Sequence, residues 1–394
     1  MSTRQTAISA GTLDERAVPF APPSIGAAEF AEVADTLASG WLTTGPRVAA
    51  FERAFARYTG AEHAIALNSC TAALHLSMLA AGIGPGDEVI TTPLTFCATA
   101  NVVVHAGATP VFADVDPKTF NLDPQAATAA MTSRTRALLP VHFGGRPADV
   151  GTFRGLARKR DLTLIEDAAH CVEGVAQGRK VGSIGDFTCF SFYATKNLTT
   201  GEGGMVTTSD AKAAAFIRMA SLHGMTRSAW TRGTHGAAAQ YDVLMPGFKY
   251  NMMDLQAAIG LHQLAAIDAR LVRRNDIWAR YDSALAGLPL TRPARVREGD
   301  VHARHLYTVL VDERAAGISR DSLQSRLAER GIATSIHFRA LHLHPFYQER
   351  FGLRRGMFPA AEAISDSTLS LPLSGAMPPE AVERVIEALH DVFG

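Results

Sequence analysis

The sequence predicts an α/β protein with a mostly parallel sheet covered by helices, followed by a smaller α+β domain. Three observations lead to this expectation. The chain has 394 residues, more than one hydrophobic core usually holds, so two domains are expected. Hydrophobic residues make up 47% and charged residues 19%, as in ordinary globular proteins. Strand patterns also alternate with helix patterns from residue 64 to residue 167, which is typical of parallel sheets.

The first part of the chain provides the alternating elements. Apolar residues at helical spacing predict the helices, beginning with a stripe formed by Phe30, Val33 and Leu37. The helices expected here are 27–39, 48–58, 72–81, 101–107 and 149–160. Short apolar runs bounded by turns predict the strands 64–67, 89–92, 110–113, 137–141 and 163–166.

The remaining part indicates where the domains divide. Two strongly periodic helices, 254–269 and 271–285, meet at a break near 267–270. The elements expected after them are a strand at 306–311, a helix at 320–330, a strand at 333–337 and a C-terminal helix. We therefore expect a loose N-terminal arm at 1–20, a large domain at 21–268 and a small α+β domain at 269–394. The polar, Gly- and Ala-rich stretch 223–241 is expected to be a functional loop.

Composition argues against several classes of partner. Lysine plus arginine equals aspartate plus glutamate at 38 each, so nothing suggests nucleic acid or an anionic membrane. The four cysteines show no CxxC spacing, which is typical of free thiols in a reducing compartment. The first twenty residues lack the apolar core of a secretory leader, and no stretch has the length needed to span a bilayer. We therefore expect a cytoplasmic enzyme.

The stretch 190–204, FSFYATKNLTTGEGG, places a lysine where a buried strand gives way to a glycine-bearing turn. Lys196 could therefore reach into a site while the strand anchors its backbone. Removal from water disfavours the ammonium form, which frees the amine to act as a nucleophile or to form a Schiff base. Taken alone, the pattern fits an ordinary surface lysine better, because lysine is common.

A second stretch, LTLIEDAAHC at 162–171, ends an apolar run in a pair of carboxylates. Asp167, at the C-terminal end of a buried strand, would point into the crevice where α/β sheets bind ligands. A Schiff-base lysine together with a buried carboxylate is the combination that pyridoxal 5'-phosphate (PLP) requires, because the carboxylate keeps the pyridine nitrogen protonated and the ring then accepts electrons. The two stretches together predict PLP as the cofactor.

The pairing of IEDAAH with FSFYATKNLTTGEGG resembles the DegT/DnrJ/EryC1/StrS family of sugar aminotransferases. The resemblance extends from about Trp41 to the C-terminus and includes, in order, WLTTGP, NSCTAALHL, GDEVITTPLTF, GATPVFADVD, PVHFGG and GFKYNMMDLQAAIGLHQL. It implies the PLP-dependent transferase fold of type I, with a large PLP-binding domain and a small C-terminal domain. It also implies a homodimer in which the two subunits share each active site.

The resemblance assigns cofactor-binding residues by their positions in these motifs. Lys196 would hold PLP covalently and Asp167 would contact its ring nitrogen. The positions implied for the phosphate are Ser69, Cys70, Thr71, Ser191 and, from the neighbouring subunit, Asn251. Small hydroxyl residues at a helix start suit phosphate, because backbone N–H groups and the positive end of the dipole are free there, although a helix cap alone would need no ligand.

Two further residues would contact the cofactor. Phe96 would lie flat on the pyridine ring, although packing in the core is a common alternative for phenylalanine. His170 occupies a position where many relatives have glutamine, and either side chain could donate to the phenolic oxygen of PLP. The sequence leaves the protonation state of His170 open.

The substrate-binding positions implied by the family are Trp41, Thr43, Tyr193, Lys249 and His337. Packing alone explains Trp41 and Tyr193 equally well. His337, His342 and His344 form a cluster whose HxH spacing can bind a metal ion. Members of the family need no metal, so we expect none.

By resemblance, the enzyme moves an amino group from L-glutamate to a keto group of a nucleotide-linked deoxysugar. GFKYNMMDLQAA and the DAAH variant resemble the branch that forms UDP-4-amino-4-deoxy-L-arabinose, which implies a 4-keto sugar on UDP. A 3-keto sugar and an aminocyclitol precursor remain open as acceptors. Related dehydratases replace the lysine with histidine, so Lys196 argues against that activity. The intact Lys196, Asp167 and Ser191 argue against a regulatory member without catalysis.

Overall fold

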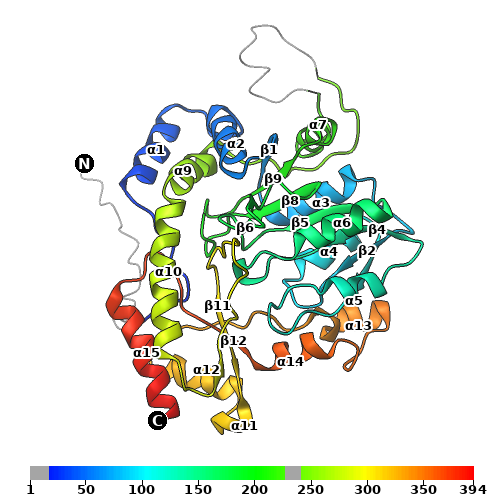
Figure 1. Ribbon diagram of the computed structural model, residues 1–394. Coiled ribbons are helices and arrows are strands. Elements are labelled where there is room, and N and C mark those ends of the chain that lie inside the picture. The colour runs from blue at the N-terminus through cyan, green and yellow to red at the C-terminus, as the bar shows by residue number, and fades with distance from the viewer. Residues whose placement is uncertain (1–16, 227–240) are drawn as a thin grey trace, which may run out of the picture.

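The computed structural model describes residues 17–226 and 241–394. Most of the arm predicted at 1–20 and of the loop predicted at 223–241 lies outside these ranges. A large sheet lies among the helices labelled α3, α4 and α6, and a smaller sheet lies near α12 and α15 (Figure 1). No helix within the described ranges is long and apolar enough to cross a membrane.

Within the described ranges the larger sheet has seven strands, and β9 runs antiparallel to the other six. In spatial order the strands are β1 (His63–Leu67), β9 (Gly204–Thr208), β8 (Phe187–Ser191), β5 (Thr163–Asp167), β4 (Thr135–Leu139), β2 (Glu88–Thr91) and β3 (Thr109–Phe112). The prediction of a mostly parallel sheet is confirmed. The lysine stretch connects β8 to β9, which inserts between β8 and β1.

Helices cover both faces of this sheet. Alternate residues of β5 show the division, because Ile165 is buried in the core on one face and Leu164 in a core on the other. The helices on the face of Ile165 are α3 (Cys70–Ala80), α4 (Ala98–His105) and α7 (Ala211–Ala220). The helices on the opposite face are α2 (Pro46–Thr59), α5 (Pro124–Ala129), α6 (Val150–Arg160) and α9 (Asp254–Ala265).

The smaller sheet has a core of its own. Its strands, in spatial order, are β10 (Leu290–Thr291), β11 (Tyr307–Val311) and β12 (Thr368–Leu371). The helices that share this core are α10 (Ile267–Ala284), α12 (Arg320–Glu329) and α15 (Pro379–Phe393). The two periodic helices predicted around residue 268 are α9 and α10, separated at Ala266. The division into domains at that point stays a prediction.

The strand predicted at 333–337 is wrong. Only isolated bridges occur in this region, between Ile332 and Val18 and between Ser335 and Ser370, because the contacts of β12 beyond Ser335 involve side chains rather than a backbone ladder. The other short elements are β6 (Val175–Ala176), β7 (Arg179–Lys180), α11 (Glu313–Ala316), α13 (Pro345–Phe351), α14 (Pro359–Ser367) and the 3-10 turns Phe143–Gly145 and Leu341–Leu343.

The end of the predicted arm is not loose. Val18 is buried in the core of the small sheet. Its N–H donates to the Gly331 carbonyl at 2.8 Å, and its carbonyl accepts from the Ala333 N–H at 3.0 Å. Two backbone bonds and one buried apolar side chain therefore fix this segment, which corrects the expectation for residues 17–20.

Helix α1 (Ala27–Ala38) turns its polar side inward. The stripe expected from its spacing is largely exposed, with Phe30 68% and Leu37 56% accessible. Glu29 is buried instead and accepts hydrogen bonds from Gln263 at 2.6 Å and Arg270 at 3.3 Å. Helix α1 lies beside α9 (Figure 1), and Gln263 of α9 and Arg270 of α10 both bind it through Glu29.

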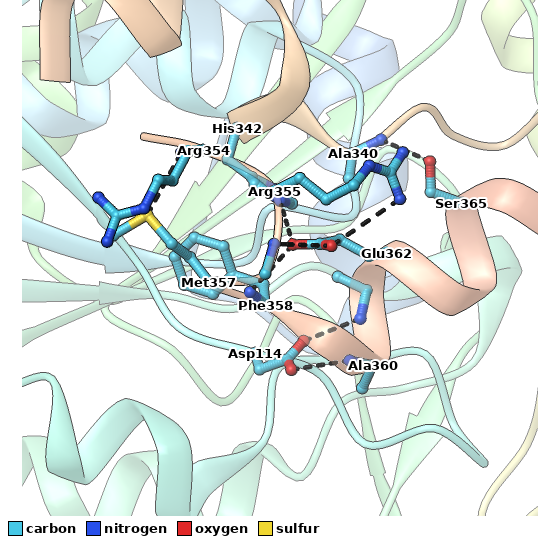
Figure 2. Close-up of polar contacts among 12 residues, drawn as sticks. Asp114, Ala340, His342, Arg354, Arg355, Met357, Phe358, Ala360, Glu362 and Ser365 are labelled. Carbon is cyan, nitrogen blue, oxygen red and sulfur yellow. Dashed lines mark hydrogen bonds and ion pairs between the residues drawn. The ribbon is translucent and has the colours of Figure 1, made fainter. Parts of the chain in front are cut away.

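Polar contacts around α14 join the small-sheet region to the larger sheet (Figure 2). Asp114, which follows β3, accepts hydrogen bonds from two N–H groups in the first turn of α14, both at 2.9 Å. Glu362 within α14 accepts from the Gly356 N–H at 2.8 Å and lies 2.9 Å from His342 Nε2. His342 is therefore paired with a carboxylate. Among the described residues no group of three His, Cys, Asp or Glu side chains is placed to hold a metal ion.

Candidate active site

A cavity of about 650 Å³ lies where β5 and β8 end and α3 begins. Ten of the predicted site residues line it: Ser69, Cys70, Thr71, Phe96, Asp167, His170, Ser191, Tyr193, Lys196 and His337. Four predicted residues do not: Trp41, Thr43, Lys249 and Asn251. The lysine and the carboxylate on which the sequence argument depends thus share one cavity.

Asp167 is the last residue of β5, and its buried carboxylate lines the cavity. Its Oδ2 accepts a hydrogen bond from Thr99 Oγ1 at 2.8 Å, and its Oδ1 accepts one from the Ala169 N–H at 3.1 Å. Burial raises the pKa of Asp167, because removal from water disfavours the carboxylate, while these two donors act in the opposite direction. A positively charged group inside the cavity would pair with the carboxylate of Asp167.

Lys196 lies in a tight turn that follows β8. Its N–H donates to the Tyr193 carbonyl at 2.9 Å, and the Thr200 N–H donates to the Phe192 carbonyl at 2.9 Å. Burial lowers the pKa of Lys196 from 10.5 to about 8, although Cys70 and Asp167 act against this shift. An appreciable part of the amine is therefore neutral near pH 7 and able to react as a nucleophile.

The start of α3 forms one wall of the cavity. Ser69 caps the helix, since its Oγ accepts from the Ala72 N–H at 3.1 Å. The N–H groups of Cys70 and Thr71 precede the intrahelical hydrogen bonds and carry the positive end of the helix dipole. Strand β9 passes directly behind, where a Cβ on Gly204 would lie 2.3 Å from the Ser69 carbonyl carbon, so only glycine allows this approach.

His170 is held between two other rings. The His305 ring lies 4.5 Å away, and the Phe338 ring lies 6.1 Å away and nearly parallel to it. The Gly144 N–H donates to His170 Nδ1 at 3.3 Å, which leaves Nε2 as the protonated nitrogen. Burial lowers the pKa of His170 well below its ordinary value, and nearby Lys196 acts in the same direction. Both observations favour a neutral ring whose Nε2 carries the proton.

Two exposed residues and one more buried histidine also line the cavity. Phe96 and Tyr193 are 60% and 48% exposed, so neither is packed in the core. His337 Nδ1 lies 2.9 Å from Ser370 Oγ, and burial lowers the pKa of His337 to about 3. The ring of Phe20 stacks on His337 at 5.6 Å. The segment before α1 therefore reaches the edge of this site.

Three of the four predicted residues outside the cavity, Trp41, Thr43 and Asn251, lie close together where the loop before α2 meets the segment before α9. Trp41 Nε1 donates to the Thr44 carbonyl at 3.1 Å, and Asn251 Nδ2 donates to Thr44 Oγ1 at 2.7 Å. The Thr43 carbonyl accepts from the Asp254 N–H at 3.3 Å. Lys249, two residues before Asn251, is exposed. None of these four residues lines the cavity that contains Lys196.

Sequence reasoning missed several residues that line the cavity, namely Thr95, Ala98, Thr99, Val141, Glu202, Ser335, Ile336 and Phe338. Thr99 lies within a predicted strand–helix connection that gave no chemical signal. His305, which contacts His170, lies far away in sequence and before a strand of the small sheet. No local pattern identifies these residues, because only the folded chain brings them to the cavity.

The cavity fits PLP in three respects. The buried carboxylate of Asp167 matches a protonated pyridine nitrogen, and the amine of Lys196 can react with an aldehyde. The N–H groups at the start of α3 can receive a phosphate. When bound, PLP supplies an electron sink that stabilises negative charge on a carbon next to an amino group. The fold and the cavity together therefore define a PLP-dependent enzyme.

Comparison with known proteins agrees with this class. The sequence profile of the DegT/DnrJ/EryC1/StrS aminotransferase family matches residues 23–390. The chain is 50% identical over 376 residues to the spore coat polysaccharide biosynthesis protein SpsC of Bacillus subtilis, covering 95% of this chain and 97% of SpsC. The structures of Spr1654 from Streptococcus pneumoniae in its PLP-form and PMP-form are each 36% identical with a TM-score of 0.88, covering 95% of this chain and 98% of Spr1654.

A third structure is that of PseC from Helicobacter pylori, an aminotransferase involved in the biosynthesis of pseudoaminic acid. It is 27% identical with a TM-score of 0.88, and the match covers 96% of this chain and 99% of PseC. The chain belongs to the DegT/DnrJ/EryC1/StrS aminotransferase family. It is an aminotransferase with PLP as its cofactor, and the predicted fold is confirmed.

Proposed function

We propose that this enzyme transfers an amino group from L-glutamate to a keto group of a nucleotide-linked deoxysugar, with a 4-keto sugar on UDP as the acceptor. The observation that carries the proposal is the shared cavity of Lys196 and Asp167 in a chain of this family. Two relatives support a sugar acceptor, because PseC is involved in the biosynthesis of pseudoaminic acid and SpsC in that of a spore coat polysaccharide. We also place the protein in the cytoplasm, because its four cysteines are free thiols and thiols stay reduced there.

Lys196 is the central residue of the proposed mechanism. Its amine would hold the aldehyde of PLP when the cofactor is bound, and a neutral amine at this position could accept and return a proton. The lowered pKa of Lys196 suits both tasks, because the amine must be neutral to attack and to accept a proton.

The other cavity residues hold the cofactor in place. Asp167 would keep the pyridine nitrogen protonated, and His170 would donate its Nε2–H to the phenolic oxygen. The Ser69-Cys70-Thr71 segment at the start of α3 and Ser191 on β8 would bind the phosphate. Phe96 would contact the ring, and Tyr193 and His337, which also line the cavity, would contact the substrate.

We also propose a homodimer in which each active site is completed by the partner. In one subunit, Lys249 and Asn251 lie outside the cavity that contains Lys196, together with Trp41 and Thr43. The exposed Lys249 would then contribute its charge to the substrate of the other subunit, and Asn251 would contact the other subunit's phosphate.

The donor and the acceptor are tested separately. The PLP-loaded protein is mixed with L-glutamate while the visible absorption band of the cofactor and the formation of 2-oxoglutarate are followed. Acceptors are then compared by kcat/KM in a panel of 4-keto and 3-keto sugars on UDP, TDP and GDP, with aminocyclitols run in the reverse direction. Lys196→Ala serves as the inactive control, because it removes the amine and keeps the rest of the cavity.

The expected result is a half-reaction with L-glutamate and a preference of at least about tenfold in kcat/KM for a UDP-linked 4-keto sugar, the discrimination that one or two good contacts provide. Preference for a 3-keto sugar or a cyclitol would overturn the proposed acceptor while leaving the aminotransferase activity intact. Full turnover in Lys196→Ala would overturn the mechanism itself.

A further inference from the structure

A chain of two threonine hydroxyls lies behind the carboxylate of Asp167. Thr99 Oγ1 lies 2.8 Å from Asp167 Oδ2, and Thr95 Oγ1 lies 2.9 Å from Thr99 Oγ1. Both threonines are buried, and both line the cavity. Thr99 belongs to the first turn of α4, and Thr95 to the loop before it. Neither residue was predicted to belong to the site.

The direction of these hydrogen bonds follows from their chemistry. An ionised carboxylate only accepts, so Thr99 must donate its hydroxyl proton to Asp167. The Thr99 oxygen is then free to accept, so Thr95 donates to Thr99. Successive hydroxyl donors polarise one another, which strengthens the final bond to the carboxylate.

Few other groups stabilise the charge of Asp167. The Ala169 N–H donates to Oδ1 at 3.1 Å, and the Cys70 thiol lies 4.0 Å from the same oxygen, too far for a strong bond. The ionisable groups that face Asp167 from the surrounding elements are Lys196, His142, Cys70 and Cys189. Thr99 is therefore the one strong side-chain donor to Asp167 within the described parts of the chain.

We propose that Thr99, supported by Thr95, is a positioning residue that keeps Asp167 ionised and oriented toward the ring nitrogen of PLP. The inference rests on the role proposed above for Asp167. Oδ2 is fixed by Thr99 and Oδ1 by Ala169, so the plane of the carboxylate is set before the cofactor binds. A carboxyl group that kept its proton would not stabilise the positive charge on a pyridinium ring.

The test replaces the hydroxyl with a methyl group of nearly the same shape. Thr99→Val removes the donor, Thr99→Ser restores it, and Thr91→Val is the matched control. Thr91 is a buried threonine in β2 whose hydroxyl donates to the Leu139 carbonyl at 2.8 Å and not to Asp167. The affinity of the cofactor-free proteins for PLP is measured by equilibrium titration, with the melting temperature recorded in parallel.

We expect Thr99→Val to bind PLP about tenfold to a hundredfold more weakly, the range expected for losing one hydrogen bond to a charged group. Thr99→Ser should recover most of that loss, and Thr95→Val should show a smaller loss of the same kind. Thr91→Val should keep the parent affinity even if it melts earlier. Equal losses in Thr91→Val and Thr99→Val would overturn the inference.

A pH titration separates this role from a general loss of structure. Burial already raises the pKa of Asp167, and losing the Thr99 donor should raise it further. Since the ionised form is needed, PLP affinity in Thr99→Val should fall away at a higher pH on acidification than in the parent. An unchanged midpoint would mean that Thr99 acts only through packing, contrary to the inference.

Asp167→Asn keeps the two proposals distinguishable. If Asp167→Asn binds PLP weakly while Thr99→Val binds it as the parent does, the inference about Thr99 fails and the role of Asp167 stands. If Asp167→Asn binds PLP as tightly as the parent, the role proposed for Asp167 fails, and the inference fails with it.

Discussion

The lowered pKa of Lys196 predicts how the cofactor-free enzyme reacts with PLP as pH changes. Only the neutral amine attacks an aldehyde. With a pKa of about 8, about one amine in ten is neutral at pH 7, against about one in three thousand at the ordinary value of 10.5. Lys196 should therefore react roughly three hundredfold faster at pH 7 than an otherwise equal lysine that titrates normally.

The assay is stopped-flow mixing of cofactor-free protein with PLP between pH 6 and pH 10. Nα-acetyllysine is run at each pH, because the ratio of the two rates cancels the ionisation of PLP itself. The protein rate should rise tenfold per pH unit below about 8 and level off above it. Lys196→Ala should form no Schiff-base band beyond the absorption of free PLP.

Asp167→Asn extends the same experiment. The carboxylate favours the ammonium form of Lys196, so its removal should move the midpoint to lower pH. A protein rate that keeps rising to pH 10 in parallel with Nα-acetyllysine would refute the reasoning, because it would mean that burial does not lower the pKa of Lys196. A midpoint that moves to higher pH in Asp167→Asn would contradict the inference that the Asp167 carboxylate raises the pKa of Lys196.

Three further predictions concern stability and are checked by urea unfolding. Glu173→Ala leaves the buried guanidinium of Arg274 without its partner, so it should cost about 3–5 kcal/mol, and an unchanged midpoint would contradict this. Gly155→Ala should add about 0.5–1 kcal/mol, because the glycine lies in α6 and an added Cβ meets nothing within 4 Å; a loss of stability would show hidden strain. Burial alone would raise the pKa of Glu362, but backbone N–H donors and His342 lower it below 4.5. The ionised side chain therefore contributes fully to the free energy of unfolding above pH 4.5, and this contribution is lost as the pH falls through the folded-state pKa. The deficit of Glu362→Gln should therefore be largest near neutral pH and shrink in acid, and a deficit that grows in acid would contradict the assignment.

Local patterns in the sequence were sufficient for the layered architecture. Strand and helix periods depend on neighbouring residues, so the strands of the larger sheet up to residue 167 were predicted to within a few positions. The strand predicted at 333–337 is the exception. Its apolar pattern was local, but Ser335 makes only a single backbone bridge to the small sheet, and His337 contacts that sheet through side-chain hydrogen bonds instead.

Helix α1 shows the same limit of local reasoning. Its spacing indicated a helix, but the direction that its sides face was decided by Gln263 and Arg270, which bind Glu29 from distant parts of the chain. The packing of Val18 into the small-sheet core is likewise invisible to the sequence, since its backbone partners, Gly331 and Ala333, lie more than three hundred residues away.

The sequence by itself determined the reactive groups of this protein. A lysine after one buried strand and a carboxylate at the end of another are local features, and their chemical requirements indicated PLP. Only the tertiary structure decided what surrounds them: the Thr99 hydroxyl on Asp167, the Gly144 N–H that sets the tautomer of His170, and the burial that lowers the pKa of Lys196. Hydrogen-bond geometry and desolvation depend on atoms that are distant in sequence and meet only in the folded chain.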